Sequence, residues 1–236
     1  MRVRVRFTKL GRVRFVSHRD VARVWERAIR RAELPIAYSE GFSPRPKVHF
    51  GLALSVGHTS DAEYLDLDLR DPVELTTLPQ RLTPCLPVGI DVTAAAEVAT
   101  SDTSLQAAVD VVTWRFLVDG DPTSVGRAAE EMMARPSIPT VINRKGNDQQ
   151  ADLRPALRSI TVEAAAEGTA QLTVNLATRP KSFRPAEVLT AFDPPLGERR
   201  VHRIEQWIID DDGALQPPLA ARLDTVGPPE PCLRAG

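Results

Sequence analysis

The first residues of the chain alternate strictly between charged and apolar side chains. In RVRVRF, residues 2–7, arginine stands at every even position and valine or phenylalanine at every odd one. This period of two predicts a half-buried strand. Residues 21–32 instead repeat apolar side chains every three to four positions, which predicts a helix that ends before Pro35. Ser17, followed three residues later by Asp20, predicts a capping box at the start of this helix.

The rest of the first half predicts two strands, a short helix and a final strand. The two strands cover residues 47–54 and 62–69, and a turn-prone segment joins them. The helix is expected over 71–82, with a proline near its start, and the last strand over 89–98. The predicted order is therefore strand, helix, two strands, helix and strand.

The second half repeats this order. Its strands are predicted over 111–118, in the two arms of a hairpin over 159–176, and over 200–209, and its helices over 122–135 and 184–192. The simplest architecture is α+β, with two tandem ferredoxin-like (βαββαβ) domains over residues 1–97 and 109–212 and a linker near 98–108.

Two further segments lack this periodicity. Residues 143–155 are polar and turn-rich, which predicts a long loop. From 213 to 236 the chain is rich in proline and shows no hydrophobic period, which predicts a disordered C-terminal tail.

The composition favours a cytoplasmic protein that does not enter a membrane. No run of apolar residues is long enough for a transmembrane helix, and the alternating N-terminus lacks the apolar core of a signal peptide. The two cysteines, Cys85 and Cys232, lie far apart and have no metal-type spacing. The sequence therefore predicts neither a disulfide framework nor a metal site, and no motif indicates a cofactor.

The charge is unevenly distributed. The whole chain has a formal net charge of −1, yet residues 1–50 hold thirteen Lys or Arg against four Asp or Glu, a local net charge of +9. An electropositive end of this kind is typical of proteins that bind polyanions such as nucleic acid. Within it, the arginines of the first strand (Arg4, Arg6), the one before the first helix (Arg14) and two on its polar side (Arg23, Arg27) are candidates for contact with RNA phosphates. The alternative for the strand is a solvated face, or one that forms ion pairs with the second half.

The segment YSEGFSPRPK, residues 38–47, predicts a rigid recognition loop. Its backbone is restricted by two prolines, and a glycine permits a turn that a side chain would forbid; these are Pro44, Pro46 and Gly41. The loop offers two aromatic side chains for stacking on bases and two basic ones for phosphates: Tyr38, Phe42, Arg45 and Lys47. The alternative is that the aromatic side chains fill the core and the prolines only direct the chain.

His18 is a candidate catalytic residue. It stands at the start of the first predicted helix, where the positive end of the helix dipole favours its neutral form. With His49 or His58 it could form an acid and base pair for metal-independent RNA cleavage. The alternative is a histidine that only orders the start of the helix by hydrogen bonding.

Several short motifs of the first 70 residues resemble a known family, the radical-SAM-linked domain of unknown function. They are Phe7, Lys9, FVSHRD (15–20), RAIRRAELP (27–35), YSEGFSPRPK (38–47), ALSVGHTS (53–60) and Glu63. The resemblance implies association with a radical SAM enzyme and a place in RNA or ribosome metabolism, without an established activity. The chain itself lacks the three clustered cysteines that hold the iron–sulfur cluster of such an enzyme.

These observations favour a non-catalytic RNA-binding adaptor that presents ribosomal or transfer RNA to a radical SAM enzyme. One alternative is an endoribonuclease that uses His18. Another is a protein–protein docking module whose basic face binds an acidic partner enzyme.

Overall fold

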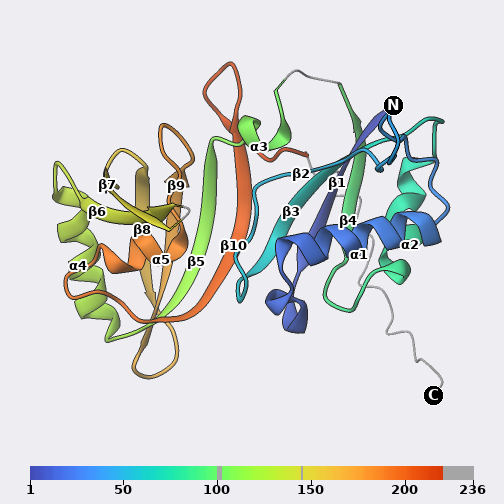
Figure 1. The fold of residues 1–236 in the computed structure, drawn as a ribbon. Coiled ribbons are helices and arrows are strands. Elements are labelled where there is room, and N and C mark those ends of the chain that lie inside the picture. Colours follow the sequence, from blue (N-terminus) through green and yellow to red (C-terminus); the bar gives the residue numbers. More distant parts are fainter. Residues whose placement is uncertain (100–102, 145, 220–236) are drawn as a thin grey trace.

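The computed structural model describes residues 1–99, 103–144 and 146–219, and it shows a mixed α+β fold built on one large, mostly antiparallel sheet (Figure 1). The elements of the first half follow in the predicted order. They are β1 (Arg2–Lys9), α1 (His18–Arg31), β2 (Val48–Phe50), β3 (Thr59–Asp68), α2 (Leu78–Leu82) and β4 (Val92–Val98), with 3-10 helices over Gly11–Phe15, Leu75–Thr77 and Thr83–Cys85. Helix α2 is shorter than predicted because Pro79 lies in its first turn, the one part of a helix where proline fits.

The second half contains one hairpin that the sequence did not predict. Its elements are α3 (Leu105–Ala108), β5 (Val111–Asp119), α4 (Pro122–Ala134), β6 (Pro139–Arg144), β7 (Asn147–Asp152), β8 (Leu157–Ala164), β9 (Thr169–Ala177), α5 (Pro185–Thr190), β10 (Glu198–Ile209) and β11 (Leu215–Gln216). Strands β6 and β7 pair with each other where a loop was expected over 143–155, so that prediction was wrong. Within this hairpin, Ile142 and Leu153 are buried and attach it to the core.

The large sheet runs through both halves of the chain. Its order is β4-β1-β3-β10-β5-β9-β8, with β2 added beside β3 and β11 beside β10. All neighbouring strands are antiparallel except β3 and β10, which are parallel and meet at Thr59 with His202 and at Ser60 with Arg203. Strand β3 therefore shares one edge between two partners, β10 at its N-terminal end and β2 at its C-terminal end.

The helices α1, α2, α4 and α5 pack on one face of this sheet. In the first half, alternate residues of β1 point into the core as predicted, and Val3, Val5 and Phe7 are almost fully buried against α1 and α2. In the second half, residues of β5 such as Trp114 and Phe116 pack against α4 and α5. The two apolar clusters are separate, and polar side chains line the junction of β3 and β10 between the two halves.

The opposite face of the sheet is partly covered by segments that the sequence interpretation treated as linker and tail. Leu105 of α3 and Leu219 are both buried, and they pack with Tyr64 of β3. Residues 215–216 pair with the end of β10. The prediction of disorder was therefore wrong for residues 213–219, because Leu219 finds an apolar site there, and residues 220–236 lie outside the described part of the chain. No helix in the described residues is long and apolar enough to cross a membrane.

Candidate nucleic-acid interface and adjacent pocket

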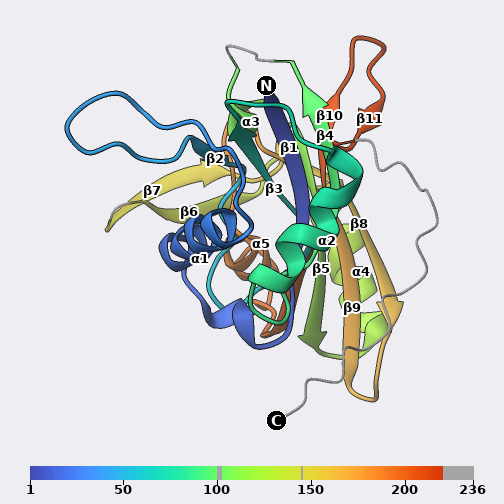
Figure 2. The same ribbon diagram turned by 90° about the vertical axis from the view of Figure 1, so that its right-hand side faces the viewer.

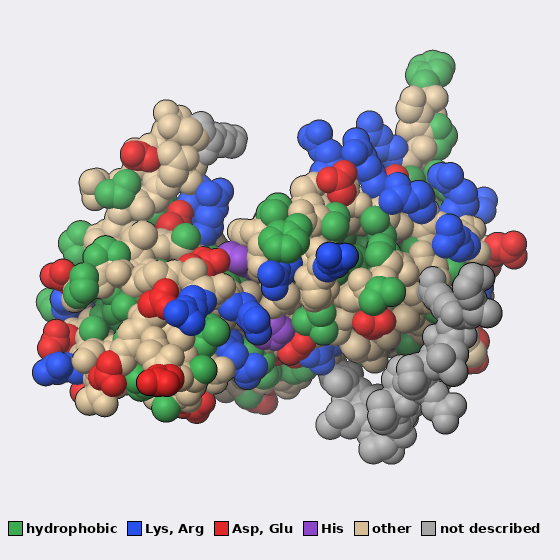
Figure 3. All heavy atoms as spheres, turned by 90° about the horizontal axis from the view of Figure 1, so that it is seen from below, with side chains coloured by type: hydrophobic (Ala, Val, Ile, Leu, Met, Phe, Trp, Pro, Cys, Tyr) green, Lys and Arg blue, Asp and Glu red, His purple; other side chains and the backbone are tan. Residues whose placement is uncertain are grey.

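Helix α1 is buried on one side and strongly basic on the other. Ser17 caps its start as predicted, since its hydroxyl accepts a hydrogen bond from the Asp20 N–H at 3.2 Å. One side packs into the core through Trp25 and its neighbours. The other side bears five exposed arginines, which we call the arginine face: Arg19, Arg23, Arg27, Arg30 and Arg31. Figure 3 shows basic side chains gathered on this part of the molecule, beside a hollow that separates it from the β6–β7 hairpin.

The charges of the arginine face are largely available to a ligand. Arg23 donates to Asp20 at 3.1 Å, but both side chains are more than half exposed, so this pair is weak. Arg27 forms no hydrogen bond or ion pair with any of the described residues. Arg14, in the 3-10 helix before α1, is half-buried with its guanidinium over the ring of Phe15 at 4.7 Å.

The 38–47 loop projects beyond α1 on the same side of the sheet (Figure 2). Its base is held as a hairpin, because the Lys47 N–H donates to the Ala37 carbonyl at 2.8 Å and the Ser39 N–H donates to the Arg45 carbonyl at 2.8 Å. At the tip, Gly41 adopts a φ of 115°, a conformation in which a side chain would be strained. The segment is therefore an ordered arm and not a free loop.

The aromatic side chains of this arm face solvent. Phe42 is fully exposed at the tip, and Tyr38 is 45% exposed. Neither fills the core, so the alternative interpretation of the loop was wrong for both. The side chains of Arg45 and Lys47 are exposed and make no hydrogen bond or ion pair with the described residues. The arm thus presents the exposed ring of Phe42 close in sequence to two cations that have no partner among the described residues. Proteins that bind single-stranded nucleic acid combine stacking aromatic rings with basic side chains in this way.

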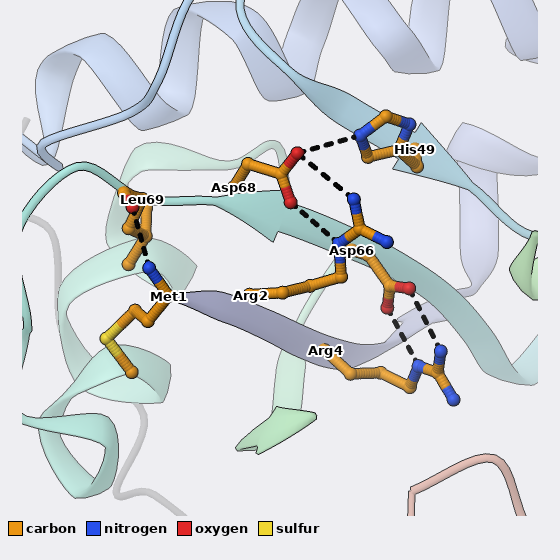
Figure 4. A network of polar contacts seen from close by, with 7 residues as sticks. All are labelled: Met1, Arg2, Arg4, His49, Asp66, Asp68 and Leu69. Carbon is orange, nitrogen blue, oxygen red and sulfur yellow. Dashed lines mark hydrogen bonds and ion pairs between the residues drawn. The ribbon is translucent and has the colours of Figure 1, made fainter. Parts of the chain in front are cut away.

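The arginines of β1 differ from this pattern, because carboxylates neutralise them. Arg4 forms two hydrogen bonds with Asp66, directly opposite on β3, at 2.7 and 2.9 Å (Figure 4). Arg6 pairs with Glu205 of β10 at 2.8 Å. The pair of Arg6 fits the alternative in which the strand forms ion pairs with the second half, whereas the partner of Arg4 lies in the first half. We leave Arg4 and Arg6 out of the proposed RNA surface.

His18 lies at the first residue of α1 without either histidine proposed as its partner. Its ring packs edge to face against Phe50, with ring centroids 5.4 Å apart. His49 precedes Phe50 on β2, so its side chain points to the other face, where it bonds Asp68 at 3.2 Å. His58 is buried and lies 3.3 Å from Glu198. Among the described residues, neither histidine forms a hydrogen bond or ring contact with His18.

A small pocket with a cavity volume of about 10 Å³, room for one water molecule at most, lies between α1, the end of β1 and the segment after β2. Its walls are mostly aromatic and aliphatic, and its polar side chains are Lys9, His18 and Glu63. These three residues belong to the motifs that carry the family resemblance. Lys9 and Glu63 are buried, whereas His18 is exposed and marks the mouth. Burial lowers the pKa of Lys9, and the charge of Glu63 partly opposes this effect.

A buried arginine that the sequence analysis missed joins the pocket to the second half. Arg203 of β10 is 2% exposed and donates to Glu63 at 2.8 Å and to the carbonyl oxygens of Leu52 and Ala53 at 2.9 and 3.0 Å. Its guanidinium also lies over the ring of Trp114 at 4.8 Å. The alternation of β10 contained the signal, since Arg203 occupies the same face as the buried Val201.

Further polar contacts cross the β3–β10 junction, which we call the seam. Tyr64 donates to Glu205 at 2.6 Å, and Gln206 donates to the Ala62 carbonyl at 2.7 Å. On the edge of the seam, His202 bonds Asp61 at 2.8 Å. The two halves are therefore joined by hydrogen bonds and ion pairs whose partners lie far apart in the sequence.

The seam is expected to weaken in mild acid because of His58. Burial lowers the pKa of this imidazole, and the opposing effect of Glu198 is smaller. The unfolded chain then binds the proton more readily than the folded one, so this contribution to stability is present above the unfolded pKa of about 6.5 and is lost as the pH falls below it. Urea unfolding between pH 8 and pH 5 should show a smaller pH dependence for His58→Gln than for the wild type. The exposed His49→Gln serves as the control, and an unchanged slope in His58→Gln would contradict the prediction.

The fold is that of a mixed α+β protein with a mostly antiparallel sheet, and the site is a basic face with a neighbouring pocket. A family model described as "Uncharacterized protein conserved in bacteria (DUF2344)" matches residues 2–185, so the chain belongs to this family. No curated protein matches it.

Among solved structures, a chain in the "Crystal Structure of a Cbf5-Nop10-Gar1 Complex" is similar to this protein with a TM-score of 0.52 and 8% sequence identity. The match covers 86% of this chain and 48% of the other, so it spans about half of that longer chain. At such low identity the likeness shows the fold alone.

Proposed function

We propose that this protein is an RNA-binding adaptor that uses the arginine face of α1 and the 38–47 arm. The observation that carries the proposal is Phe42, a large apolar ring left fully exposed at the tip of an ordered loop near Arg45 and Lys47. Removal of an exposed ring of this kind does not destabilise the folded protein. In a complex with RNA the ring stacks on a base, and the cations pair with phosphates. Contacts of this type favour unpaired bases over duplex.

The proposed adaptor has no catalytic activity of its own. Its partner would be the radical SAM enzyme that the sequence resemblance implies, acting on ribosomal or transfer RNA. We prefer the adaptor to the endoribonuclease alternative because, among the described residues, His49 bonds Asp68, His58 pairs with Glu198 and neither bonds His18.

We also propose that each half is a ferredoxin-like unit. In the first half β4-β1-β3 continues into β2, and in the second the order is β10-β5-β9-β8. Numbered within each half, and without the separate β6–β7 hairpin, both orders are 4-1-3-2. The shared strand order supports this proposal, and the helices α1, α2, α4 and α5 lie on one face of the sheet, together with the arginine face and the arm.

The Phe42→Ala variant tests the function directly. We expect its affinity for a fluorescent single-stranded RNA of mixed sequence to fall about five- to a hundredfold, the range of one lost base–aromatic stack. Its free energy of unfolding should change by less than about 0.5 kcal/mol, because the ring touches no core. Affinity is measured by fluorescence anisotropy and stability by urea unfolding.

A matched control removes another exposed apolar side chain. Val88 is 86% exposed in the segment before β4, and Val88→Ala should bind RNA as the wild type does. Equal affinity of Phe42→Ala and wild type would remove Phe42 from the interface. If the wild type binds no RNA, the proposal is wrong, and the basic face becomes a docking surface for an acidic partner protein.

A further inference from the structure

A groove with a volume of about 600 Å³ lies between the C-terminal end of α4 and the start of β8, the last strand of the large sheet. We call it the α4–β8 groove. Its apolar lining includes Met133 and Leu157, and every polar side chain that lines it is an arginine: Arg135, Arg154 and Arg158. None of the described residues that line it carries a carboxylate. The volume falls in the usual range of sites that bind a ligand.

The three arginines of this groove are available to an anionic partner. None of them forms an ion pair within the part of the chain that the structure describes. Arg135 and Arg158 are exposed. Arg154 is half-buried and donates to the Leu157 carbonyl at 3.0 Å, which fixes its guanidinium and leaves its other N–H groups for an acceptor. The neighbouring carboxylate of Asp152 is engaged elsewhere, since it accepts hydrogen bonds from two backbone N–H groups at 2.8 and 2.9 Å.

An acidic counterpart lies on the hairpin formed by β10 and β11, which projects beyond the end of the sheet (Figure 1). Its turn is held by the carboxylate of Asp210, which accepts hydrogen bonds at 2.8 and 2.6 Å from a backbone N–H and a side-chain amide of the same hairpin. The next two side chains, Asp211 and Asp212, are exposed and form no hydrogen bond or ion pair with the described residues. Beside them, Ile209 and Leu215 are 41% and 47% exposed. The hairpin thus presents two available carboxylates between two apolar side chains.

The β10–β11 hairpin and the α4–β8 groove stand at the same end of the sheet. Near the end of β10, Trp207 pairs with Val111 of β5, which pairs in turn with Ala177 of β9. One residue earlier on β9, Leu176 pairs with Leu157, which lines the groove. Only β5 and β9 therefore separate the strand that carries the hairpin from the strand that carries the groove. A two-fold axis that passes between them brings the hairpin of each of two copies to the groove of the other.

We propose that two copies of this chain form a dimer in which the β10–β11 hairpin of each lies in the α4–β8 groove of the other. The carboxylates of Asp211 and Asp212 pair with the arginines, and the apolar side chains beside them cover the apolar lining. Both contacts are the same by symmetry, so the assembly closes at two copies. A nucleic acid suits this groove less well, because none of the lining residues offers an aromatic ring on which a base could stack.

The test is a charge swap followed by sedimentation velocity on the full chain. The hairpin variant carries Asp211→Lys and Asp212→Lys, and the groove variant carries Arg135→Glu and Arg158→Glu. Like charges then face each other in both contacts, so the dissociation constant of each variant dimer should rise at least about tenfold. An equal mixture of the two variants should dimerise as the wild type does, because every hairpin then meets a groove of opposite charge. Urea unfolding checks that both variants are folded.

Two further measurements use the wild type and a control. Wild-type association should weaken from about 0.1 M to about 1 M salt, where the Debye length falls from about 10 Å to about 3 Å. The control variant carries Arg23→Glu and Arg27→Glu on the arginine face and should dimerise as the wild type does.

Three outcomes would overturn the inference. They are a wild type that stays monomeric up to its highest soluble concentration, a mixture of the two variants that stays monomeric, and an equal loss of association in the control variant. The last outcome would place the hairpin on the arginine face instead. RNA binding is not involved in any of these measurements, so the proposed function stands or fails separately.

Discussion

A variant with Arg23, Arg27 and Arg45 all replaced by glutamate is expected to lose RNA affinity by more than about a hundredfold at 0.15 M salt. Arg27 and Arg45 have no partner among the described residues, and Arg23 has only an exposed contact with Asp20. Reversal therefore removes three favourable phosphate contacts and adds three repulsions. The slope of log affinity against log salt should also fall by about 2, since each lost phosphate contact on a single strand removes roughly 0.7.

The control for this variant changes the net charge by the same amount elsewhere. Three exposed arginines of the second half that form no ion pair with the described residues are chosen for it: Arg115, Arg127 and Arg158. Their replacement by glutamate should leave the affinity within about threefold of the wild type, because charges beyond one Debye length are screened. An equal loss of RNA affinity in both variants would show that binding depends only on the net charge of the protein. The assigned RNA surface would then be wrong.

The second large effect is expected in stability and not in binding. Arg203→Ala leaves the buried Glu63 carboxylate without its cation and the carbonyl oxygens of Leu52 and Ala53 without donors. Breaking a buried ion pair by removing one partner costs about 3–5 kcal/mol. Typical domains are stable by about 5–15 kcal/mol, so the variant should unfold at a clearly lower urea concentration.

Strand β10 offers a matched control. Arg199 pairs with Asp119, but both side chains are more than half exposed, so Arg199→Ala should cost at most about 1 kcal/mol. Arg203→Lys should fall between the two, because an ammonium group lacks the planar fork that reaches three acceptors. If Arg203→Ala were no less stable than Arg199→Ala, the seam would not depend on this arginine.

The strongly periodic elements could be predicted from the sequence. The alternation of residues 2–7 and the apolar spacing of α1 are local patterns, and burial followed them closely. For the aromatic rings of the 38–47 arm, the sequence left two alternatives, exposure or burial in the core. Its prolines and glycine restrict the backbone but do not determine what the rings contact.

The partners of charged residues could not be predicted. Arg4 faces Asp66 only because β1 and β3 pair in one particular register, and that register depends on the whole sheet. For Arg203, the alternation of β10 indicated a buried position but could not identify Glu63 as its partner. The β6–β7 hairpin was missed because β7 is polar at nearly every position and shows no apolar alternation, and tertiary contacts of Ile142 and Leu153 hold the hairpin in place.

The shared edge of β3 has a consequence for synthesis on the ribosome. Thr59 and His202, which meet across the seam, are 143 positions apart in the sequence. While the second half is being translated, the N-terminal end of β3 has no strand on that side, and an open edge is a site of pairing with other chains. Strand β2 is translated before β3 and pairs with the C-terminal end of the same β3 edge. The part of this edge that stays open is therefore limited to the few residues that β10 later covers. Completion of the sheet therefore waits for one of the last strands to emerge, and long-range pairing of this kind makes the final step slow.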